Sequence, residues 1–189
     1  MVSYKDELQR ATDLLAKEGY LFIGQNVLAG GTSLYHMVKH LPIEQRIELP
    51  VFEEIQMGMS IGMTLEGLKV CTTYPRMDFI ILALNQIINH ADKIKAMSKD
   101  QFKLKGLIIR VAVGSTKPIF SGEQHSGDYT KAFKSMCKHI KVVKLMKPEQ
   151  IVPAYKKAMK SDTPTIIIEV ADLYNSGLVK DIQKSKDIK

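Results

Sequence analysis

The chain has 189 residues, of which 45% are hydrophobic and 25% charged, values typical of one globular domain that folds without a metal or disulfide. Two cysteines, Cys71 and Cys137, are too few for a secreted disulfide scaffold and lack the spacing of a metal site, so we expect free thiols in a reducing compartment. The net charge of +7 would attract an anionic partner, but the lysines lack interleaved aromatic residues, so we predict a solvated basic surface and no nucleic-acid binding.

The first part of the chain predicts a helix, a strand and a loop. The opening stretch VSYKDELQRA is too polar for a signal peptide, and no apolar run approaches the roughly 20 residues of a membrane span, so we expect a cytoplasmic protein without a membrane anchor. Ser3 is the expected N-cap of an amphipathic helix over residues 4–18, which Gly19 ends. A short buried strand, 20–24, follows. The loop 26–33 holds a glycine pair without the spacing of a phosphate-binding loop, and we interpret it as a turn.

A helix that is apolar almost all round is predicted next. It covers residues 51–66, after a short helix at 34–40 and a strand at 47–49. Such a helix must be covered on most sides. Gly58 and Gly62 stand four apart on one face, which predicts a helix crossing in the core or a contact with another subunit.

The rest of the chain alternates strands with helices. This order predicts right-handed crossovers and hence an α/β fold of three layers, an open parallel sheet with helices on both faces. The stretch LIIRVAV is a continuous apolar run of the kind found in parallel sheets buried on both faces. The expected strands are 69–74, 107–113, 141–145 and 165–170, and the expected helices are 76–97, 129–138 and 148–160.

Two side chains fall at the edge of the predicted sheet where ligands bind. Ligands of open parallel sheets gather at the carboxyl ends of the strands, where Glu53 follows the strand 47–49 and His125 lies in the loop 114–128. Glu53 either stabilises the start of its helix or takes part in catalysis, and His125 is either functional or a plain surface histidine. No familiar nucleotide-binding, hydrolase or Cys-x-x-Cys motif is present, so spacing alone leaves both alternatives open.

Several stretches resemble, in order, segments of one enzyme family. The first is ELPVFEEIQMGMSIGMTLEGLKV, which is similar to the segment that begins near the family's cofactor glutamate. The others are ALNQIINHADKIKAMS, then LIIRVAVG followed by GEQHS, and finally HIKVVKLMKPEQIVPAYKKAMKSDTPTIIIE. From about Leu8 to Tyr174 the chain resembles the pyrimidine-binding domain of thiamine-diphosphate-dependent enzymes, and most closely the beta subunits of 2-oxo acid dehydrogenases in the transketolase-like superfamily.

The resemblance implies a role for four residues. Glu53 matches the glutamate that protonates or hydrogen-bonds the far ring nitrogen of the aminopyrimidine, so that the cofactor can deprotonate its own thiazolium carbon. Phe79 falls where the family places an aromatic ring against the pyrimidine, with Tyr74 as a neighbour. His125 matches the histidine that faces the substrate as an acid or hydrogen-bond donor. No residue of this chain is expected to bind a metal.

The resemblance also implies a partner. We expect a pyrimidine-binding domain over 1–175 and a basic tail over 176–189, without the family's C-terminal domain and without the GDG…N motif that holds magnesium and diphosphate. The chain would then be inactive alone. It would pair with a diphosphate-binding subunit that carries GDG…N, as an α2β2 heterotetramer or a homodimer, with Gly58 and Gly62 near the interface. The expected cofactors are thiamine diphosphate and magnesium, the latter held mainly by the partner chain.

Three departures from the family pattern bear on the substrate. Phe52 replaces the small residue usual before the glutamate, Asn85 stands where aspartate is common, and QHS continues as GDY. We expect an enzyme subunit of the dehydrogenase or decarboxylase type that acts on a 2-oxo acid. The alternatives are a subunit of a split transketolase-type ketol transferase with a ketose donor, and a non-catalytic binding or scaffold descendant of the fold.

Overall fold

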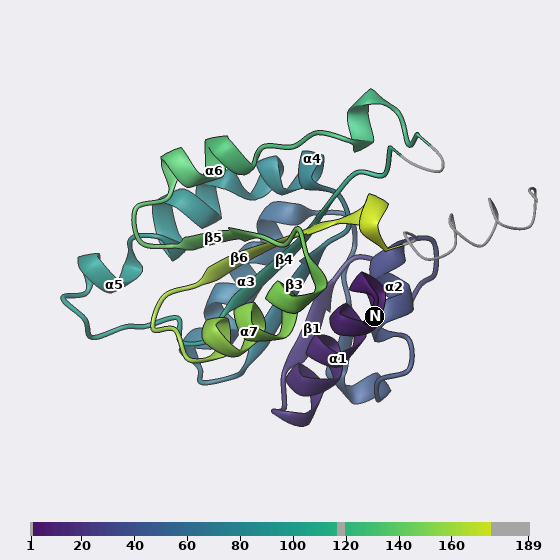
Figure 1. Cartoon of the computed structure of the whole chain (residues 1–189). Coiled ribbons are helices and arrows are strands. Elements are labelled where there is room, and N and C mark those ends of the chain that lie inside the picture. The colour runs from purple at the N-terminus through teal and green to yellow at the C-terminus, as the bar shows by residue number, and fades with distance from the viewer. Residues whose placement is uncertain (1, 117–119, 175–189) are drawn as a thin grey trace, which may run out of the picture.

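A six-stranded sheet forms the centre of the molecule. The computed structural model describes residues 2–116 and 120–174, and all of its strand pairs are parallel, in the order β2-β1-β3-β4-β6-β5. The predicted α/β fold with an open parallel sheet is confirmed (Figure 1). The basic tail predicted for 176–189 lies outside the described residues. The strands are β1 Leu21–Gly24, β2 Arg46–Glu48, β3 Val70–Tyr74, β4 Ile108–Val113, β5 Lys141–Lys144 and β6 Thr165–Val170.

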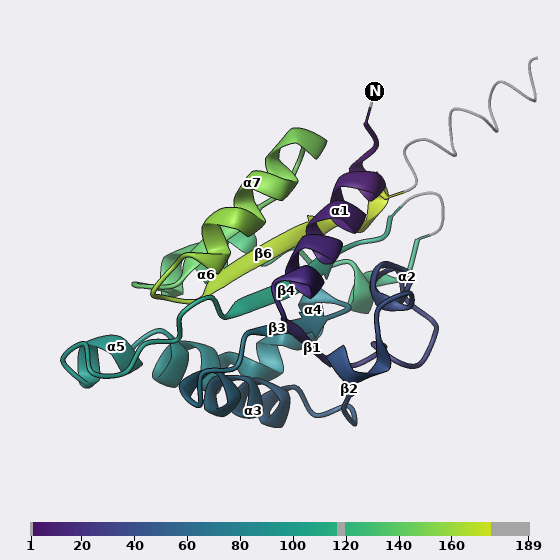
Figure 2. The ribbon, with the colours of Figure 1, turned by 90° about the horizontal axis from the view of Figure 1, so that it is seen from below.

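Helices cover both faces of the sheet, as Figure 2 shows from below. On one face lie α1, α2 and α7, and on the other lie α3, α4 and α6. None of the helices in the described part of the chain is long and apolar enough to cross a membrane. The helices are α1 Tyr4–Lys17, α2 Ser33–Val38, α3 Glu53–Leu65, α4 Met77–Ile80, α5 Ile94–Met97, α6 Thr130–Met136 and α7 Pro148–Met159.

The strands divide the core into two layers because successive side chains point to opposite faces. In β4, Ile109 and Val111 pack with α3 and α4, whereas Ile108 packs with α1 and α7. All six residues of β4 are buried, as the run LIIRVAV predicts. The ends of α1 also agree with the sequence, because the Ser3 hydroxyl accepts the N–H of Asp6 at 3.1 Å.

The predicted helix 76–97 is not one continuous α-helix, because its hydrogen-bonding pattern changes along the segment. It comprises α4, a 3₁₀ turn at Ile81–Ala83, a π-helix at Asn85–Ala91 and the short α5. Ala83 of the 3₁₀ turn and Ile87 and Ala91 of the π-helix are all buried in the core, so the segment packs on the sheet despite its changes of pitch.

One face of α3 is uncovered in this chain, so the expectation that most sides are covered is only partly met. Ile55 and Met59 are 50% and 41% exposed, and Phe52 and Leu82 beside them are 54% and 60% exposed. We call these four residues the α3 face. On another side of the helix a Cβ at Gly58 would lie 3.7 Å from the Gln86 side chain of the π-helix, whereas a Cβ at Gly62 would have no described atom within 4 Å, so the two glycines do not share one helix crossing.

A buried ion pair joins the neighbouring strands β4 and β6. The Arg110 guanidinium contacts both carboxylate oxygens of Glu169, at 2.7 and 3.2 Å, and neither side chain is exposed. Arg110 also donates to the Thr12 hydroxyl at 3.1 Å, while the Tyr155 hydroxyl donates to Glu169 at 2.6 Å and Tyr174 donates to its other oxygen. The network ties α1, α7 and the end of β6 to the centre of the sheet.

Candidate functional site

A pocket lies where the strand order reverses. The chain passes from β1 outward to β2 and then returns to β3 on the other side of β1, so the loops after β1 and β3 leave a crevice at their carboxyl ends. The pocket in this crevice has a volume of about 220 Å³. It contains all four residues singled out in the sequence. The lining residues are Gln25, Asn26, Thr32, Glu53, Tyr74, Pro75, Arg76, Phe79 and His125.

Glu53 is the first residue of α3 and is only 4% exposed. Its position is compatible with both predicted roles. It adds negative charge to the first turn of the helix, and it also lines the pocket. Gln25, the residue after β1, donates its Nε2 hydrogen to Glu53 Oε1 at 3.0 Å. Within the described residues no other donor reaches this carboxylate, so it keeps acceptor capacity for a ligand N–H.

Tyr74 is the last residue of β3 and contacts the start of α3. Its hydroxyl donates to the main-chain carbonyl of Glu53 at 3.2 Å. Burial, and then the nearby Glu53 charge, raise the pKa of Tyr74 above its ordinary value, so the hydroxyl stays protonated and remains a donor. Tyr74 therefore fixes the first turn of α3 at the pocket.

Phe79 and His125 meet across the pocket from different elements. Their ring centroids are 5.4 Å apart at 74°, an edge-on contact between α4 and the loop after β4. The loop is anchored to the same helix, because Gly127 donates its N–H to Asp78 Oδ1 at 3.1 Å. A Cβ at position 127 would lie 2.5 Å from that carboxylate, so the contact requires glycine. One short helix thus positions both the aromatic ring and the histidine.

Sequence reasoning missed Gln25 and Glu48. The carboxylate of Glu48, at the end of β2, accepts four successive main-chain N–H groups in the loop after β1, those of Asn26, Val27, Leu28 and Ala29, at 2.7, 2.7, 2.6 and 3.4 Å. This loop begins next to Gln25 and supplies Asn26 and Thr32 to the pocket. Glu48 lies 19–22 positions after these loop residues in the chain, so no local sequence signal indicates the contact.

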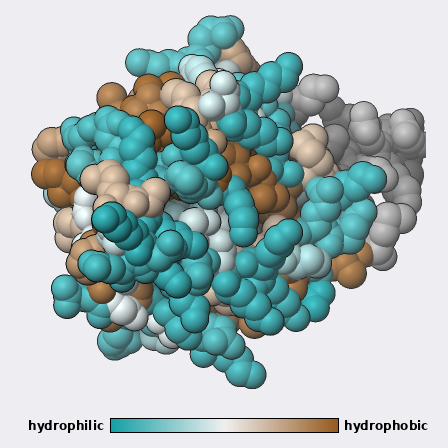
Figure 3. Space-filling model, turned by 90° about the vertical axis from the view of Figure 1, so that its left-hand side faces the viewer, coloured by the Kyte–Doolittle hydropathy of each residue, from teal (hydrophilic) through white to brown (hydrophobic). Residues whose placement is uncertain are grey.

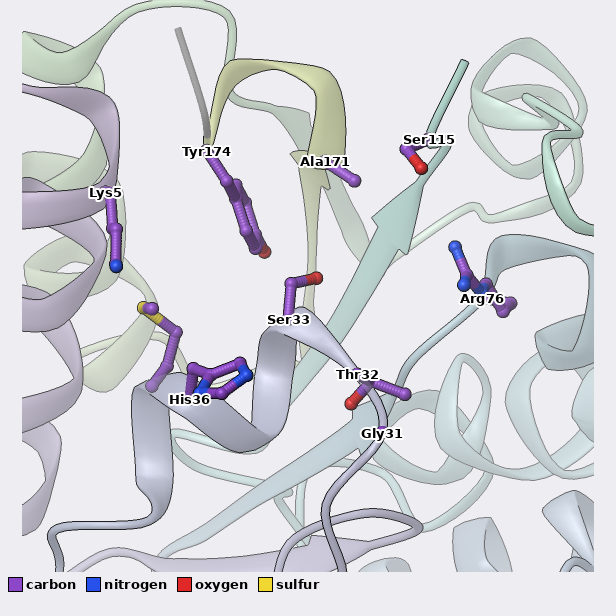
Figure 4. Close-up of a pocket in the computed structure, with 10 residues that line it drawn as sticks. Lys5, Gly31, Thr32, Ser33, His36, Arg76, Ser115, Ala171 and Tyr174 are labelled. Atoms are coloured by element: carbon purple, nitrogen blue, oxygen red, sulfur yellow. The ribbon is translucent and has the colours of Figure 1, made fainter. Parts of the chain in front are cut away.

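A second cavity of about 470 Å³ adjoins the first and shares Thr32 and Arg76 with it. Figure 4 shows Lys5, His36 and Arg76 around this hollow, with the Ser33 hydroxyl pointing into it. No carboxylate is among the described lining residues, so its charge favours an anionic ligand. The remaining lining residues are Gly31, Thr32, Met37, Ser115, Ala171 and Tyr174.

Neither cysteine lies in these pockets. Burial raises the pKa of Cys71 and of Cys137 to about 12, so both thiols stay protonated and are poor nucleophiles. In residues 2–116 and 120–174, no three His, Cys, Asp or Glu side chains group closely enough to hold a metal ion.

The fold and the pocket define an open α/β domain with a pocket at its topological switch point, lined by a buried carboxylate and an aromatic ring. Residues 1–176 match the family described as the transketolase pyrimidine-binding domain. The chain belongs to this family.

Relatives in the same family are enzyme subunits. The chain is 30% identical over 176 residues to the pyruvate dehydrogenase E1 component subunit beta of Gracilaria tenuistipitata var. liui, a match that covers 90% of this chain and 53% of the algal protein. It is 31% identical over 127 residues to the mitochondrial subunit of the same name from Ascaris suum, covering 67% of this chain and 34% of that protein. The chain therefore spans about half or less of the length of these relatives.

A solved structure confirms the fold. The protein described as a split gene transketolase, inactive beta4 tetramer, superimposes with a TM-score of 0.65 at 16% sequence identity. The match covers 90% of this chain and 51% of that one.

The pocket fits the pyrimidine half of thiamine diphosphate, the cofactor that the family implies. An aminopyrimidine offers a ring nitrogen and a flat apolar face. The Glu53 carboxylate has a free oxygen that can hydrogen-bond the ring nitrogen. Phe79 provides an aromatic ring that can pack against the flat face. Glu53, Phe79 and Tyr74 are the residues that would hold this half of the cofactor.

Proposed function

We propose that this chain is the pyrimidine-domain subunit of a split thiamine-diphosphate-dependent enzyme that acts on a 2-oxo acid. The observation that carries this proposal is the buried Glu53 carboxylate, held by Gln25 in a pocket with Tyr74, Phe79 and His125. Membership of the family supports the cofactor, and the relatives named as pyruvate dehydrogenase subunits support the 2-oxo acid.

Each pocket residue then has a task. When bound, thiamine diphosphate supplies the carbon nucleophile that attacks the substrate carbonyl. Glu53 shares a proton with the pyrimidine nitrogen and so fixes the tautomer of the ring. Phe79 packs against the ring and Tyr74 holds the helix turn that carries Glu53. His125 donates a hydrogen bond or a proton to the substrate oxygen from the opposite side of the pocket.

The subunit needs a second chain to complete the site. Magnesium and diphosphate would be bound mainly by a partner subunit that carries the GDG…N motif, in an α2β2 heterotetramer or a homodimer, and this chain alone would be inactive. The α3 face, Phe52, Ile55, Met59 and Leu82, is an apolar surface next to the helix that opens with Glu53, and we assign it to this contact. Coexpression with a GDG…N chain should give a stable complex, and Ile55→Glu should dissociate it.

A matched pair of variants tests the assignment of Glu53. In the complex, Glu53→Gln removes the shared proton and should lower turnover by at least about a hundredfold. Glu54→Gln makes the same chemical change one residue later, at a carboxylate that accepts from Asn85 at 3.0 Å outside the pocket, and should keep nearly full activity. Full activity in Glu53→Gln would refute the catalytic role. If calorimetry with thiamine diphosphate and magnesium gave no heat either, the chain would be a scaffold descendant of the fold.

The second cavity supports a second candidate, ketol transfer from a phosphorylated sugar. Its volume of about 470 Å³ and its Lys5, His36 and Arg76 side chains suit an extended substrate with a phosphate group. The fold match to a protein named as a split transketolase supports the same reading. Turnover of pyruvate against fructose 6-phosphate by the complex separates the two. In the ketol transferase, Lys5→Met should raise KM for the phosphorylated donor and leave kcat nearly unchanged.

A further inference from the structure

The positive charge of the chain is concentrated on one segment. Residues 131–160 hold nine lysines and one carboxylate, Glu149, a net charge of +8. Since the whole chain carries +7, all other residues together carry −1. This segment folds into α6, β5 and α7, which lie together at one edge of the sheet. The lysines are Lys131, Lys134, Lys138, Lys141, Lys144, Lys147, Lys156, Lys157 and Lys160.

Eight of these nine lysines form no ion pair with a carboxylate of the described residues, although Lys141 donates to the Ser161 hydroxyl at 3.3 Å. Lys144 forms an ion pair with Asp128, and it is the one member of the group that pairs with a described carboxylate. Lysines often protect the free edge of a sheet from aggregation, and β5 is an edge strand. Edge protection accounts for Lys141 and Lys144 in β5 itself. It does not account for the lysines of α6 and α7, which lie on the two sides of this strand.

An apolar groove runs between β5 and α7. It has a volume of about 400 Å³ and is lined by Val143, Pro153, Ala154 and Ala158, with Lys141 and Lys157 on its margins and Thr165 at one end. Lys141 and Thr165 are the first residues of β5 and β6, so the groove opens at the amino ends of the strands, opposite the candidate site. Figure 3 faces this side of the molecule, which is mainly hydrophilic with apolar groups showing between.

We propose that the outer edge of β5 and this groove bind an extended acidic segment of a partner protein. Within the described residues β5 pairs with β6 alone, so its outer backbone groups are open to strand addition. Alternate side chains of an added strand point to opposite faces. Apolar ones would enter the groove beside α7, and carboxylates would meet the lysines of α6 on the other face and of the groove margins.

A polypeptide fits this surface better than a nucleic acid. Phe133 and Tyr155 of the segment are both buried, which leaves the imidazole of His139 as its one exposed ring for base stacking. The segment contains no arginine, the side chain that contacts phosphate in two places. The apolar floor of the groove also offers no polar group that could bind a sugar-phosphate backbone. The surface lies at the opposite sheet edge from Glu53, so it stays accessible when a second subunit covers the candidate site.

The probe for this surface is a short fluorescent peptide of alternating glutamate and valine. Its binding to the full chain is measured by anisotropy at physiological salt. We expect Lys141→Glu with Lys157→Glu to weaken binding by at least about tenfold. The control Lys17→Glu with Lys39→Glu changes the net charge equally at exposed lysines elsewhere, and should weaken it less than about twofold.

Three results would overturn the proposal. In the first, the wild-type chain does not bind the peptide. In the second, the two double variants weaken peptide binding equally. In the third, the chain binds a single-stranded oligonucleotide of the same charge more tightly than the peptide. If the glutamate variant unfolds, as its melting temperature would reveal, Lys141→Gln with Lys157→Gln removes the charges alone. That variant should still bind more weakly than Lys17→Gln with Lys39→Gln.

Discussion

Gln25 donates a hydrogen bond to Glu53 at 3.0 Å, which links the end of β1 to the start of α3 across the candidate pocket. The two residues are 28 positions apart, and their contact depends on β1 and α3 both reaching the same sheet edge. The amide donor fixes one carboxylate oxygen and leaves the other for a ligand. Gln25 is therefore a positioning residue for the group on which the proposed chemistry depends.

Replacing Gln25 by alanine should weaken cofactor binding in the assembled enzyme. A hydrogen bond to a charged group contributes about 1.5–3 kcal/mol, so the cofactor concentration for half-maximal activity should rise roughly ten- to a hundredfold. Activity measured against thiamine diphosphate concentration checks this. Gln25→Glu should be worse, because it places a second carboxylate beside Glu53. An unchanged cofactor requirement in both variants would show that Glu53 needs no support from Gln25.

Glu48→Ala should destabilise the loop that follows β1. Four main-chain N–H groups lose their acceptor, and because several are exposed to water the expected loss is about 2 kcal/mol in the free energy of unfolding. Glu48→Gln keeps one good acceptor and should lose less. Urea denaturation measures both. The prediction fails if alanine and glutamine are equally tolerated.

The buried pair of Arg110 and Glu169 should be costly to break from one side. Arg110→Met leaves the Glu169 carboxylate buried with only tyrosine donors, so we expect a loss of about 3–5 kcal/mol in the free energy of unfolding. Glu169→Leu should cost a similar amount. The double variant should lose less than the sum, since no buried charge remains. Additive losses would mean that the two charges do not depend on each other.

Acid should remove one stabilising contribution at Asp128. Partial burial alone would raise its pKa, but the hydrogen bonds from Lys144 and Thr130 together outweigh it and keep the pKa of Asp128 below its ordinary value. Such a carboxyl stabilises the fold above its ordinary pKa and loses this effect as the pH falls through the folded value. The stability difference between wild type and Asp128→Asn should therefore shrink below about pH 4, as urea titrations across pH would show. A difference that is constant with pH would contradict this.

Local signals in the sequence were sufficient for most of the elements and for the parallel sheet. Ser3 and Gly19 mark the ends of α1, and LIIRVAV marks β4, because capping and burial on both faces act within a few residues. The π-helix at Asn85–Ala91 was not foreseen, since its register follows from packing against the sheet. Arg110 illustrates the same limit. Its position inside an apolar strand has meaning only beside Glu169, 59 residues away.

The candidate site was predictable only through resemblance. Spacing left Glu53 between a helix-stabilising and a catalytic role, and His125 between a functional and a surface role. The structure brings both into one pocket with Phe79 and Tyr74. Gln25 and Glu48 could not be found in advance, because a loop glutamine and a strand-end glutamate acquire partners only when β1, β2 and α3 are in place.

The order of the strands also sets when the pocket can exist. Phe22 of β1 pairs with Cys71 of β3, and every other pairing in the sheet is likewise parallel and joins strands distant in the chain. Such non-local contacts close large loops and form slowly. The loops that carry Gln25 and Tyr74 cannot meet until the register of β1 on β3 is established. A nascent or partly folded chain therefore has no half-formed site, and recognition of a cofactor or partner becomes a late event that reports completed folding.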